Sequence, residues 1–165
     1  MANTAKVSCT ATNMKIETAH NSDAPAILAL QRLAYQSEAA LYPGHQIPAL
    51  SQSLEELLEE MGQMIFLKAL IEGELVGSVR AKLEGPDWQI GRLIVSPKFQ
   101  GQGIGTALLT TIEMAAPEQA THHVLFTGHL SHRNLELYER RGYQRFDQKT
   151  VTLGLDLVFL KKEVK

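Results

Sequence analysis

Apolar residues recur along this chain at two spacings, one typical of helices and one typical of strands. Spacings of three and four residues, from Ile27 to Leu30 and Ala34, predict a helix that Asp23 caps. The predicted helices are residues 24–41, 54–61, 103–115 and 131–140, and the predicted strands are residues 14–18, 65–71, 75–83, 88–95, 123–127, 143–147 and 150–160. This order predicts a mixed α/β layer architecture, with a loop around Pro48.

One segment has the pattern of a phosphate-binding turn. The strand at 88–95 leads through Pro97 into Gln100-Gly-Gln-Gly103-Ile-Gly105, and a helical pattern follows. Because these glycines have no Cβ, successive backbone N–H groups and the positive end of the helix can approach a pyrophosphate. The turn has neither the Lys-Ser/Thr ending of a P-loop nor an acidic residue placed for a dinucleotide ribose. It therefore predicts a different nucleotide-like cofactor.

The same segment resembles the acetyl-CoA signature of the GCN5-related N-acetyltransferases, Gln/Arg-x-x-Gly-x-Gly/Ala, and Val95-Ser-Pro97 matches the Val-x-Pro that precedes it in the family. A second segment, Asn134-Leu-Glu-Leu-Tyr138-Glu-Arg-Arg-Gly142-Tyr, is similar to the family's Asn-x-x-x-Tyr-Glu-x-x-Gly-Phe/Tyr. The resemblance covers roughly residues 14–161. It implies the family's α/β fold, with a mixed central sheet of about six to seven strands and about four helices, as one domain over residues 14–165. Residues 1–13 match nothing and are expected to be a disordered arm or a tag.

The resemblance implies acetyl-CoA as the acyl donor. In the family the fourth and fifth strands run parallel and splay apart, and the pantetheine arm of the cofactor lies in the gap. The cofactor-binding residues implied here are Leu93, Ile94, Val95, Gln100, Gly101, Gln102, Gly103, Ile104, Gly105, Thr106 and Asn134.

The resemblance also implies that Tyr138 is the general acid. A phenol with a pKa of about 10 stays protonated at neutral pH and can give its proton to a departing thiolate. Many relatives place a Glu general base on or near the fourth strand, where this chain has residues 89–92, Gln-Ile-Gly-Arg. The remaining candidates for the base are Glu38, Glu84, Asp87 and His129, acting directly or through water. An amine that arrives partly neutral is a further alternative.

The first helix and the loop after it cover the acceptor side of the site in relatives, which implies Tyr35, Glu38 and Tyr42 as substrate-binding residues. Glu38 could attract a cationic amine. The competing interpretation is that both tyrosines pack on the core and Glu38 is a solvated helix residue.

Composition argues against several other functions. With a formal charge of −2 and a pI near 6.3, the chain has no electrostatic footprint for nucleic acid or a membrane surface, and no apolar run approaches the length of a membrane helix. The lone Cys9 excludes an internal disulfide framework and is expected to be inert, and a cytoplasmic location is expected. His122 and His123 point to opposite strand faces, and His129-x-x-His132 lacks a third ligand, so no metal is expected.

Two functions remain from the sequence. The first is an N-acetyltransferase that moves acetyl groups directly to a primary amine of a small molecule or peptide, and the alternative is a catalytically silent acyl-CoA-binding sensor or scaffold. A homodimer is possible, with the strand at 150–160 as the edge for pairing.

Overall fold

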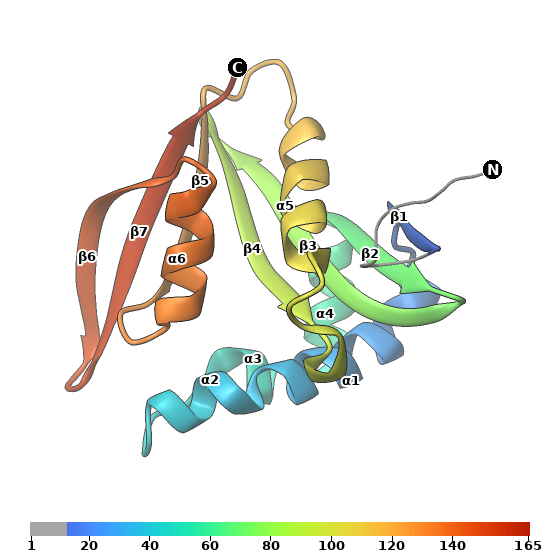
Figure 1. The fold of residues 1–165 in the computed structure, drawn as a ribbon, viewed down its shortest axis with the longest axis horizontal. Coiled ribbons are helices and arrows are strands. Elements are labelled where there is room, and N and C mark those ends of the chain that lie inside the picture. The colour runs from blue at the N-terminus through green and yellow to red at the C-terminus, as the bar shows by residue number, and fades with distance from the viewer. Residues whose placement is uncertain (1–12) are drawn as a thin grey trace.

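A seven-stranded sheet in the order β1-β2-β3-β4-β5-β7-β6 runs through the computed structural model, which describes residues 13–165 (Figure 1). The strands are β1 Met14–Thr18, β2 Ile65–Ile71, β3 Glu74–Glu84, β4 Asp87–Val95, β5 His122–Gly128, β6 Gln144–Thr152 and β7 Leu155–Glu163. The helices are α1 Ala24–Ala34, α2 Gln36–Leu41, α3 Pro48–Ser51, α4 Leu54–Met61, α5 Ile104–Met114 and α6 His132–Arg140, with single 3₁₀ turns at Asn21–Asp23 and Pro97–Phe99. The predicted arm at residues 1–13, apart from Asn13, and Cys9 within it lie outside the described residues.

The sheet is antiparallel except where β4 meets β5. These two strands pair in parallel over only three positions, from Asp87 opposite His122 to Gln89 opposite Val124. Beyond Gln89 they diverge, and Figure 1 shows the gap between their carboxyl ends. The splay expected between the fourth and fifth strands is therefore present.

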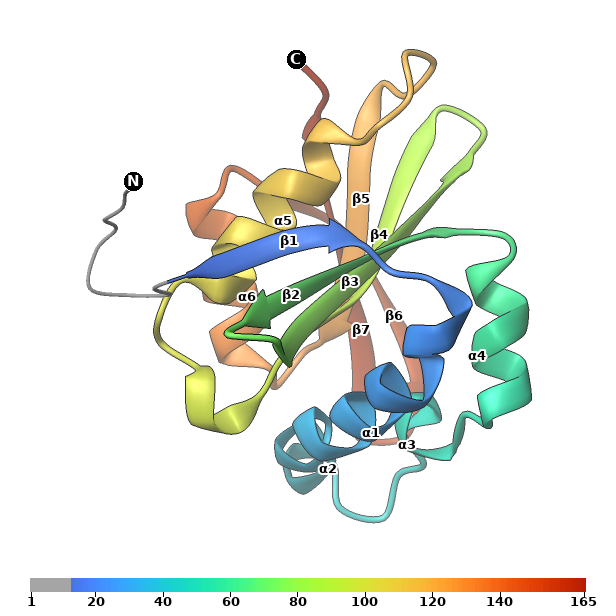
Figure 2. The same ribbon diagram turned by 90° about the vertical axis from the view of Figure 1, so that its right-hand side faces the viewer.

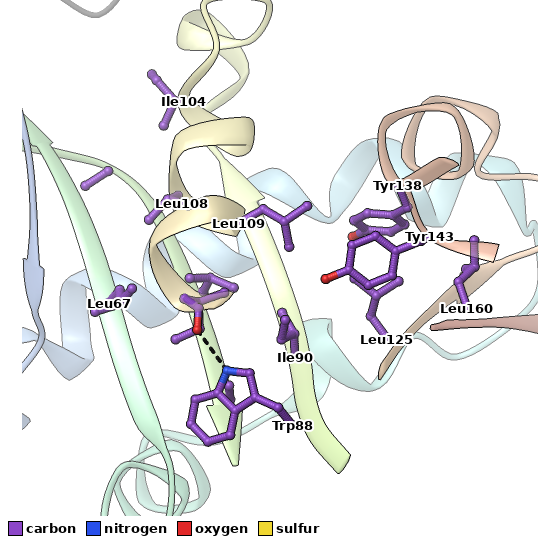
Figure 3. Packing of buried hydrophobic residues seen from close by; sticks show 14 of the residues in the cluster. Leu67, Trp88, Ile90, Ile104, Leu108, Leu109, Leu125, Tyr138, Tyr143 and Leu160 are labelled. Carbon is purple, nitrogen blue, oxygen red and sulfur yellow. Dashed lines mark hydrogen bonds between the residues drawn. The ribbon is translucent and has the colours of Figure 1, made fainter. Parts of the chain in front are cut away.

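Helices cover both faces of the sheet (Figure 2). On one face, α5 and α6 pack against a large apolar cluster that includes Leu108, Leu109 and Tyr138 (Figure 3). The indole Nε1 of Trp88 in β4 donates a hydrogen bond to the Ile112 carbonyl of α5 at 2.8 Å. On the other face, α1 and α4 bury a smaller cluster that contains Ile27, Leu57 and Phe66. The larger cluster includes Trp88 and Ile90 of β4, so this strand packs against the helical layer that contains α5.

The structure corrects the predicted boundaries of the first helix. It is not continuous to Leu41, because Tyr35 takes a ψ of 0° and separates α1 from α2. The residues around Pro48 are not a plain loop, since they form the short helix α3. Both short helices, α2 and α3, contact α1.

The final hairpin also differs from its prediction. The turn lies at Leu153 and Gly154 rather than near residues 148–149, and Gly154 has a φ of 90°. All nine residues of β6 are exposed. The strand therefore lacks the alternation of buried apolar and exposed polar residues from which its end could have been predicted. Moreover, β7 lies between β5 and β6, so the edge strand is β6 and not the strand at 150–160 that was expected to pair.

Within residues 13–165, no helix combines the length and apolar character needed to cross a membrane.

Candidate active site

A first pocket of about 350 Å³ lies where β4 and β5 splay apart. Its walls come from the end of β4, the glycine turn, the first residues of α5 and one face of α6. It is lined by every residue implied for cofactor binding except Gln102, namely Leu93, Ile94, Val95, Gln100, Gly101, Gly103, Ile104, Gly105, Thr106 and Asn134. Two motifs about thirty residues apart in the sequence thus line one pocket.

The glycine turn presents bare backbone to this pocket. Gly101 and Gly103 have φ angles of 81° and 84°, a conformation that other residues rarely adopt, and a Cβ on either would meet no atom within 4 Å. Gly103 is the N-cap of α5 and supplies no side-chain cap. The first N–H groups of α5 have no partner within the helix, so they and the helix dipole can receive an anion. The open space and the unpaired donors fit a pyrophosphate.

The edge of β4 that faces β5 is also open. Pairing with β5 stops at Gln89, whereas pairing with β3 continues on the other side as far as Val95. Backbone groups of β4 beyond Gln89 are therefore free of strand partners on the β5 side. An extended, amide-containing chain can hydrogen-bond there as an extra strand would.

Basic residues on α6, which were not among the predicted cofactor-binding residues, add positive charge to the first pocket. Arg133, Leu137 and Arg140 line the pocket, and their spacing of four and three residues places them on one helix face. The Arg133 guanidinium donates to Gln100 Oε1 at 2.9 Å, and Arg140 pairs with Glu136 at 3.4 Å. Their helical spacing was the signal that could have identified them.

A second pocket, of about 180 Å³, adjoins the first. Four residues line both pockets, and these are Tyr35, Glu38, Leu93 and Asn134. The remainder of the second lining comes mostly from α3, β4, β5 and β7 and is largely apolar. A group held in the first pocket therefore lies next to the space of the second.

Tyr138 lines this second pocket from α6. Its side chain is buried, and burial, with smaller contributions from Tyr35 and Glu38, raises the pKa of its phenol above the ordinary value. It is therefore a proton donor at neutral pH. Figure 3 shows the ring of Tyr143 beside it, but the Tyr143 hydroxyl donates to Glu113 Oε2 at 2.6 Å and lines neither pocket.

Asn134, one helical turn before Tyr138, donates from Nδ2 to Thr127 Oγ1 of β5 at 3.2 Å. The expectation that Asn134 and Tyr138 share one groove agrees with their joint place in the second pocket.

A chain of hydrogen bonds joins two of the residues that were expected to bind the acceptor, Glu38 and Tyr42. The Tyr42 hydroxyl accepts from Leu130 N–H at 3.0 Å and lies 2.9 Å from Ser131 Oγ, which donates to Glu38 Oε1 at 2.6 Å. Because the Ser131 proton goes to Glu38, the Tyr42 proton goes to Ser131. Tyr42 is 3% exposed and packs on Gly128, where a Cβ would overlap its hydroxyl.

The two interpretations of the acceptor-side residues both describe part of the structure. Tyr42 packs in the core and also lines the second pocket, while Tyr35 and Glu38 line both pockets. Glu38 is half-buried and bonded to Ser131, so it is not simply a solvated helix residue.

The structure separates the candidates for the general base. Glu84 and Asp87 face each other at the β3–β4 turn, at the opposite end of β4 from the pockets. His129 Nδ1 accepts the Asp156 N–H at 3.0 Å, and neither pocket includes this histidine. Of the four candidates, Glu38 alone lines the pockets.

Arg92 lines the second pocket at the position where a carboxylate was sought on β4. The register with β3 shifts here, and Arg92 has a φ of 49°, as expected for a β-bulge. Neither the bulge nor the direction of this side chain was predicted from the sequence.

Comparison with known proteins agrees with this architecture. The Acetyltransferase (GNAT) family matches residues 26–143. The rat protein N-acetyltransferase family 8 member 2 is 31% identical over 103 residues, which are 62% of this chain and 43% of that protein. The chain therefore spans less than half the length of this relative.

Solved structures share the fold at low sequence identity. The PaiA N-acetyltransferase from Thermoplasma acidophilum, in complex with coenzyme A, has a TM-score of 0.77 and 19% identity, covering 91% of this chain and 98% of that one. The putative acetyltransferase yncA from Salmonella typhimurium, with its cofactor acetyl-CoA, has a TM-score of 0.74 and 19% identity, with 93% and 95% covered. The ribosomal-protein-S18-alanine N-acetyltransferase from Escherichia coli has a TM-score of 0.73 and 17% identity, with 92% and 94% covered.

These likenesses define the fold as that of the GNAT acetyltransferases. Since the family match spans more than half of the chain, the protein belongs to the GNAT family.

Proposed function

We propose that this protein is an acetyl-CoA-dependent N-acetyltransferase that moves the acetyl group directly to a primary amine of a small molecule or peptide. The observation that carries the proposal is the junction of the two pockets at Tyr35, Glu38, Leu93 and Asn134. This junction would hold donor and acceptor side by side, as direct transfer in a ternary complex requires.

The first pocket fits acetyl-CoA, which supplies an acetyl group activated as a thioester when bound. The turn at Gly101 and Gly103 and the N–H groups that begin α5 would bind the pyrophosphate, with Arg133 adding positive charge. The open edge of β4 at Leu93 and Val95 would hold the amides of the pantetheine arm. The acetyltransferases from Thermoplasma acidophilum and Salmonella typhimurium, solved with coenzyme A and acetyl-CoA, support this assignment.

Tyr138 and Glu38 would handle the protons. In the overall reaction a C–N bond forms to the acceptor nitrogen and the C–S bond breaks. The ammonium nitrogen would lose two protons, one to Glu38 before attack and one that replaces the proton given by Tyr138 to the sulfur, which leaves as a thiol. Tyr138 stays protonated at neutral pH and would donate to the departing sulfur. Glu38 Oε1 accepts from Ser131, which leaves its second oxygen for the ammonium group and its proton.

One observation favours a second candidate, a catalytically silent acyl-CoA-binding module. Residues 89–92 of β4 carry no carboxylate, and Arg92 points its charge into the acceptor pocket instead. A protein that only binds acyl-CoA needs the first pocket but no base.

Release of thiol from acetyl-CoA with a panel of amines would separate the two functions. Tyr138→Phe should lower kcat by about 10²- to 10⁴-fold, the usual contribution of a general acid, with an unchanged Kd for acetyl-CoA. Tyr143→Phe is the matched control, because it removes a neighbouring buried phenol that lines neither pocket, and it should retain kcat. Tight acetyl-CoA binding with no release for any amine would favour the silent module.

Three further expectations stay predictions. They are the cytoplasmic location, the independence from metal and a homodimer. The edge strands of the sheet are β1 and β6, so the strand expected at 150–160 does not supply the pairing edge over most of its length. Residues 13–165 contain no group of three or more His, Cys, Asp or Glu side chains arranged to hold a metal ion.

A further inference from the structure

Two opposite charges face the second pocket without pairing with each other. Arg92 lines it from β4 and Glu38 lines it from α2. No ion pair joins Arg92 to any carboxylate within residues 13–165, and Glu38 has Ser131 as its hydrogen-bond donor there. A half-buried charge without a partner is costly, so each of these groups is suited to a charged ligand.

The Arg92 guanidinium is poorly satisfied by the protein. Its one hydrogen bond in the described residues is from Nη1 to Gln52 Oε1, at the long distance of 3.5 Å. Gln52 Oε1 already accepts the Gln31 amide at 3.0 Å. A guanidinium has five N–H donors in a planar fork that matches a carboxylate, so most of its capacity remains for a ligand.

A buried network of hydrogen bonds adjoins Arg92 without neutralising it. Arg80, which is 2% exposed, donates to Glu60 at 2.6 Å and to Gln31 Oε1 at 2.8 Å. Glu60 is therefore the counter-ion of Arg80, and the amides of Gln31 and Gln52 carry the contacts onward to Arg92 as neutral groups. The charge of Arg92 is felt in the pocket, because it opposes the rise that burial causes in the pKa of Tyr35.

The space between the two charges is small and apolar. Side chains from α3, β4, β5 and β7 line it, including Ile47, Ile90, Phe126, Leu155 and Leu157. The pocket volume of about 180 Å³ is below the roughly 300–1,000 Å³ of pockets for drug-sized ligands. It therefore suits a compact molecule with an apolar portion.

We infer that the amine acceptor is a free α-amino acid with an apolar side chain, held by its carboxylate on Arg92 and by its ammonium group on Glu38. This inference rests on the proposed acetyltransferase function. It assigns Arg92 as a specificity-determining residue, since an amine without a carboxylate would leave the guanidinium desolvated and unpaired.

Three acceptors that share a phenyl ring and a primary amine, and differ in carrying a carboxylate, a carboxamide or neither, test the role of the carboxylate. The kcat/KM for acetylation is measured with L-phenylalanine, L-phenylalaninamide and 2-phenylethylamine. The wild-type protein should prefer L-phenylalanine by about 10- to 100-fold, the factor expected for a hydrogen bond to a charged group. Arg92→Gln should remove that preference, and Arg92→Lys should restore part of it. The activity with 2-phenylethylamine should not fall in either variant, and it should rise in Arg92→Gln, because that variant no longer leaves a guanidinium unpaired beside the amine.

Arg32→Gln is the matched control. Arg32 also donates to Gln52, at 3.1 Å to its backbone oxygen, but it lines neither pocket. This variant should keep the preference for the amino acid. Thermal unfolding of all three variants checks that each one is folded, and titration of L-phenylalanine in the presence of CoA measures binding independently of turnover.

The outcomes separate this inference from the proposed function. Turnover of all three acceptors at equal rates, or an equal loss for all three in Arg92→Gln, would overturn the inference and leave the acetyltransferase in place. Binding of L-phenylalanine that depends on Arg92, without thiol release, would support the ligand class and contradict the transferase. Neither thiol release nor binding with these acceptors would overturn the inference, and the amine panel would then decide whether the transferase stands.

Discussion

Gly128 is the position where a single methyl group should disturb both stability and the acceptor site. A Cβ at this residue would overlap the Tyr42 hydroxyl oxygen and lie 2.5 Å from Cζ of the same ring. Real Cβ atoms do not approach other heavy atoms so closely, and the ring is 3% exposed, so it has little room to give way. Gly128→Ala must therefore displace Tyr42.

The cost follows from what Tyr42 loses. Overpacking of a buried site costs about 1–3 kcal/mol, and each lost hydrogen bond about 0.5–1.5 kcal/mol. The two bonds at stake join the hydroxyl to Leu130 N–H and to Ser131 Oγ. Allowing about 0.4–1 kcal/mol for the lower entropy of the unfolded alanine chain, we expect a loss of about 2–5 kcal/mol in unfolding free energy. For a chain of this size that lowers the melting temperature by roughly 4–20 °C.

Chemical denaturation of four proteins provides the assay: the wild type, Gly128→Ala, Tyr42→Ala and the double variant. If the methyl acts through the ring, Gly128→Ala should cost almost nothing once Tyr42 is alanine, so the two changes should be strongly non-additive. Gly91→Ala is the control, because a Cβ there meets nothing within 4 Å and Gly91 is not at positive φ. A Gly128→Ala protein as stable as Gly91→Ala, or additive losses in the double variant, would refute this reasoning.

Two further changes test the cofactor turn and an ion pair far from it. Gly103→Val should abolish acetyl-CoA binding by filling the space of the pyrophosphate. Gly44→Val is the control, because Gly44 has a φ of 83°, close to the 84° of Gly103, and lies outside both pockets; it should lose similar stability but keep the cofactor affinity. Equal affinities of the two variants in calorimetric titration would contradict the role of the turn. Burial pushes the pKa of Asp23 upward, but hydrogen bonds from His20 N–H and the Lys68 ammonium outweigh it and hold the pKa below 3.8. Asp23→Ala should therefore cost about 1–2 kcal/mol at pH 7. The difference from wild type should shrink as the pH falls below about 4, because the unfolded chain then takes up a proton at Asp23 that the native protein takes up only at still lower pH. Urea unfolding of both proteins at pH 7 and below pH 4 checks this. If the difference in unfolding free energy stays constant with pH, the charge of Asp23 is unimportant.

Local patterns predicted most of the elements, because each depends on residues close together in the chain. Ser53 and Glu56 form a capping box at the start of α4, a pattern contained within four residues, and both of its hydrogen bonds are present. The glycine turn was predictable for the same reason, because the positive φ of Gly101 and Gly103 and the start of the following helix depend on only a few neighbouring residues. Prediction was weakest at β6, whose residues are all exposed and carry no periodic signal.

The acceptor site was less predictable because its contacts join distant segments. Tyr42 and Leu130 are 88 positions apart, and Glu38 and Ser131 are 93 apart, so neither pair shares a local pattern. Glu84, Asp87 and Glu38 were equal candidates for the base until the sheet placed the first two at the wrong end of β4. Arg92 could not be assigned to the pocket, because its direction depends on a bulge in the pairing of β3 with β4.

The sequence alone thus determined the order of the elements, the glycine turn before α5 and the helix that carries Asn134 and Tyr138, since turn chemistry and helical periodicity are local properties. Only the tertiary structure decided that the two motifs line the first pocket and that Glu38 and Arg92 both line the second. Those decisions come from sheet register and helix packing, which bring together residues that no local spacing relates.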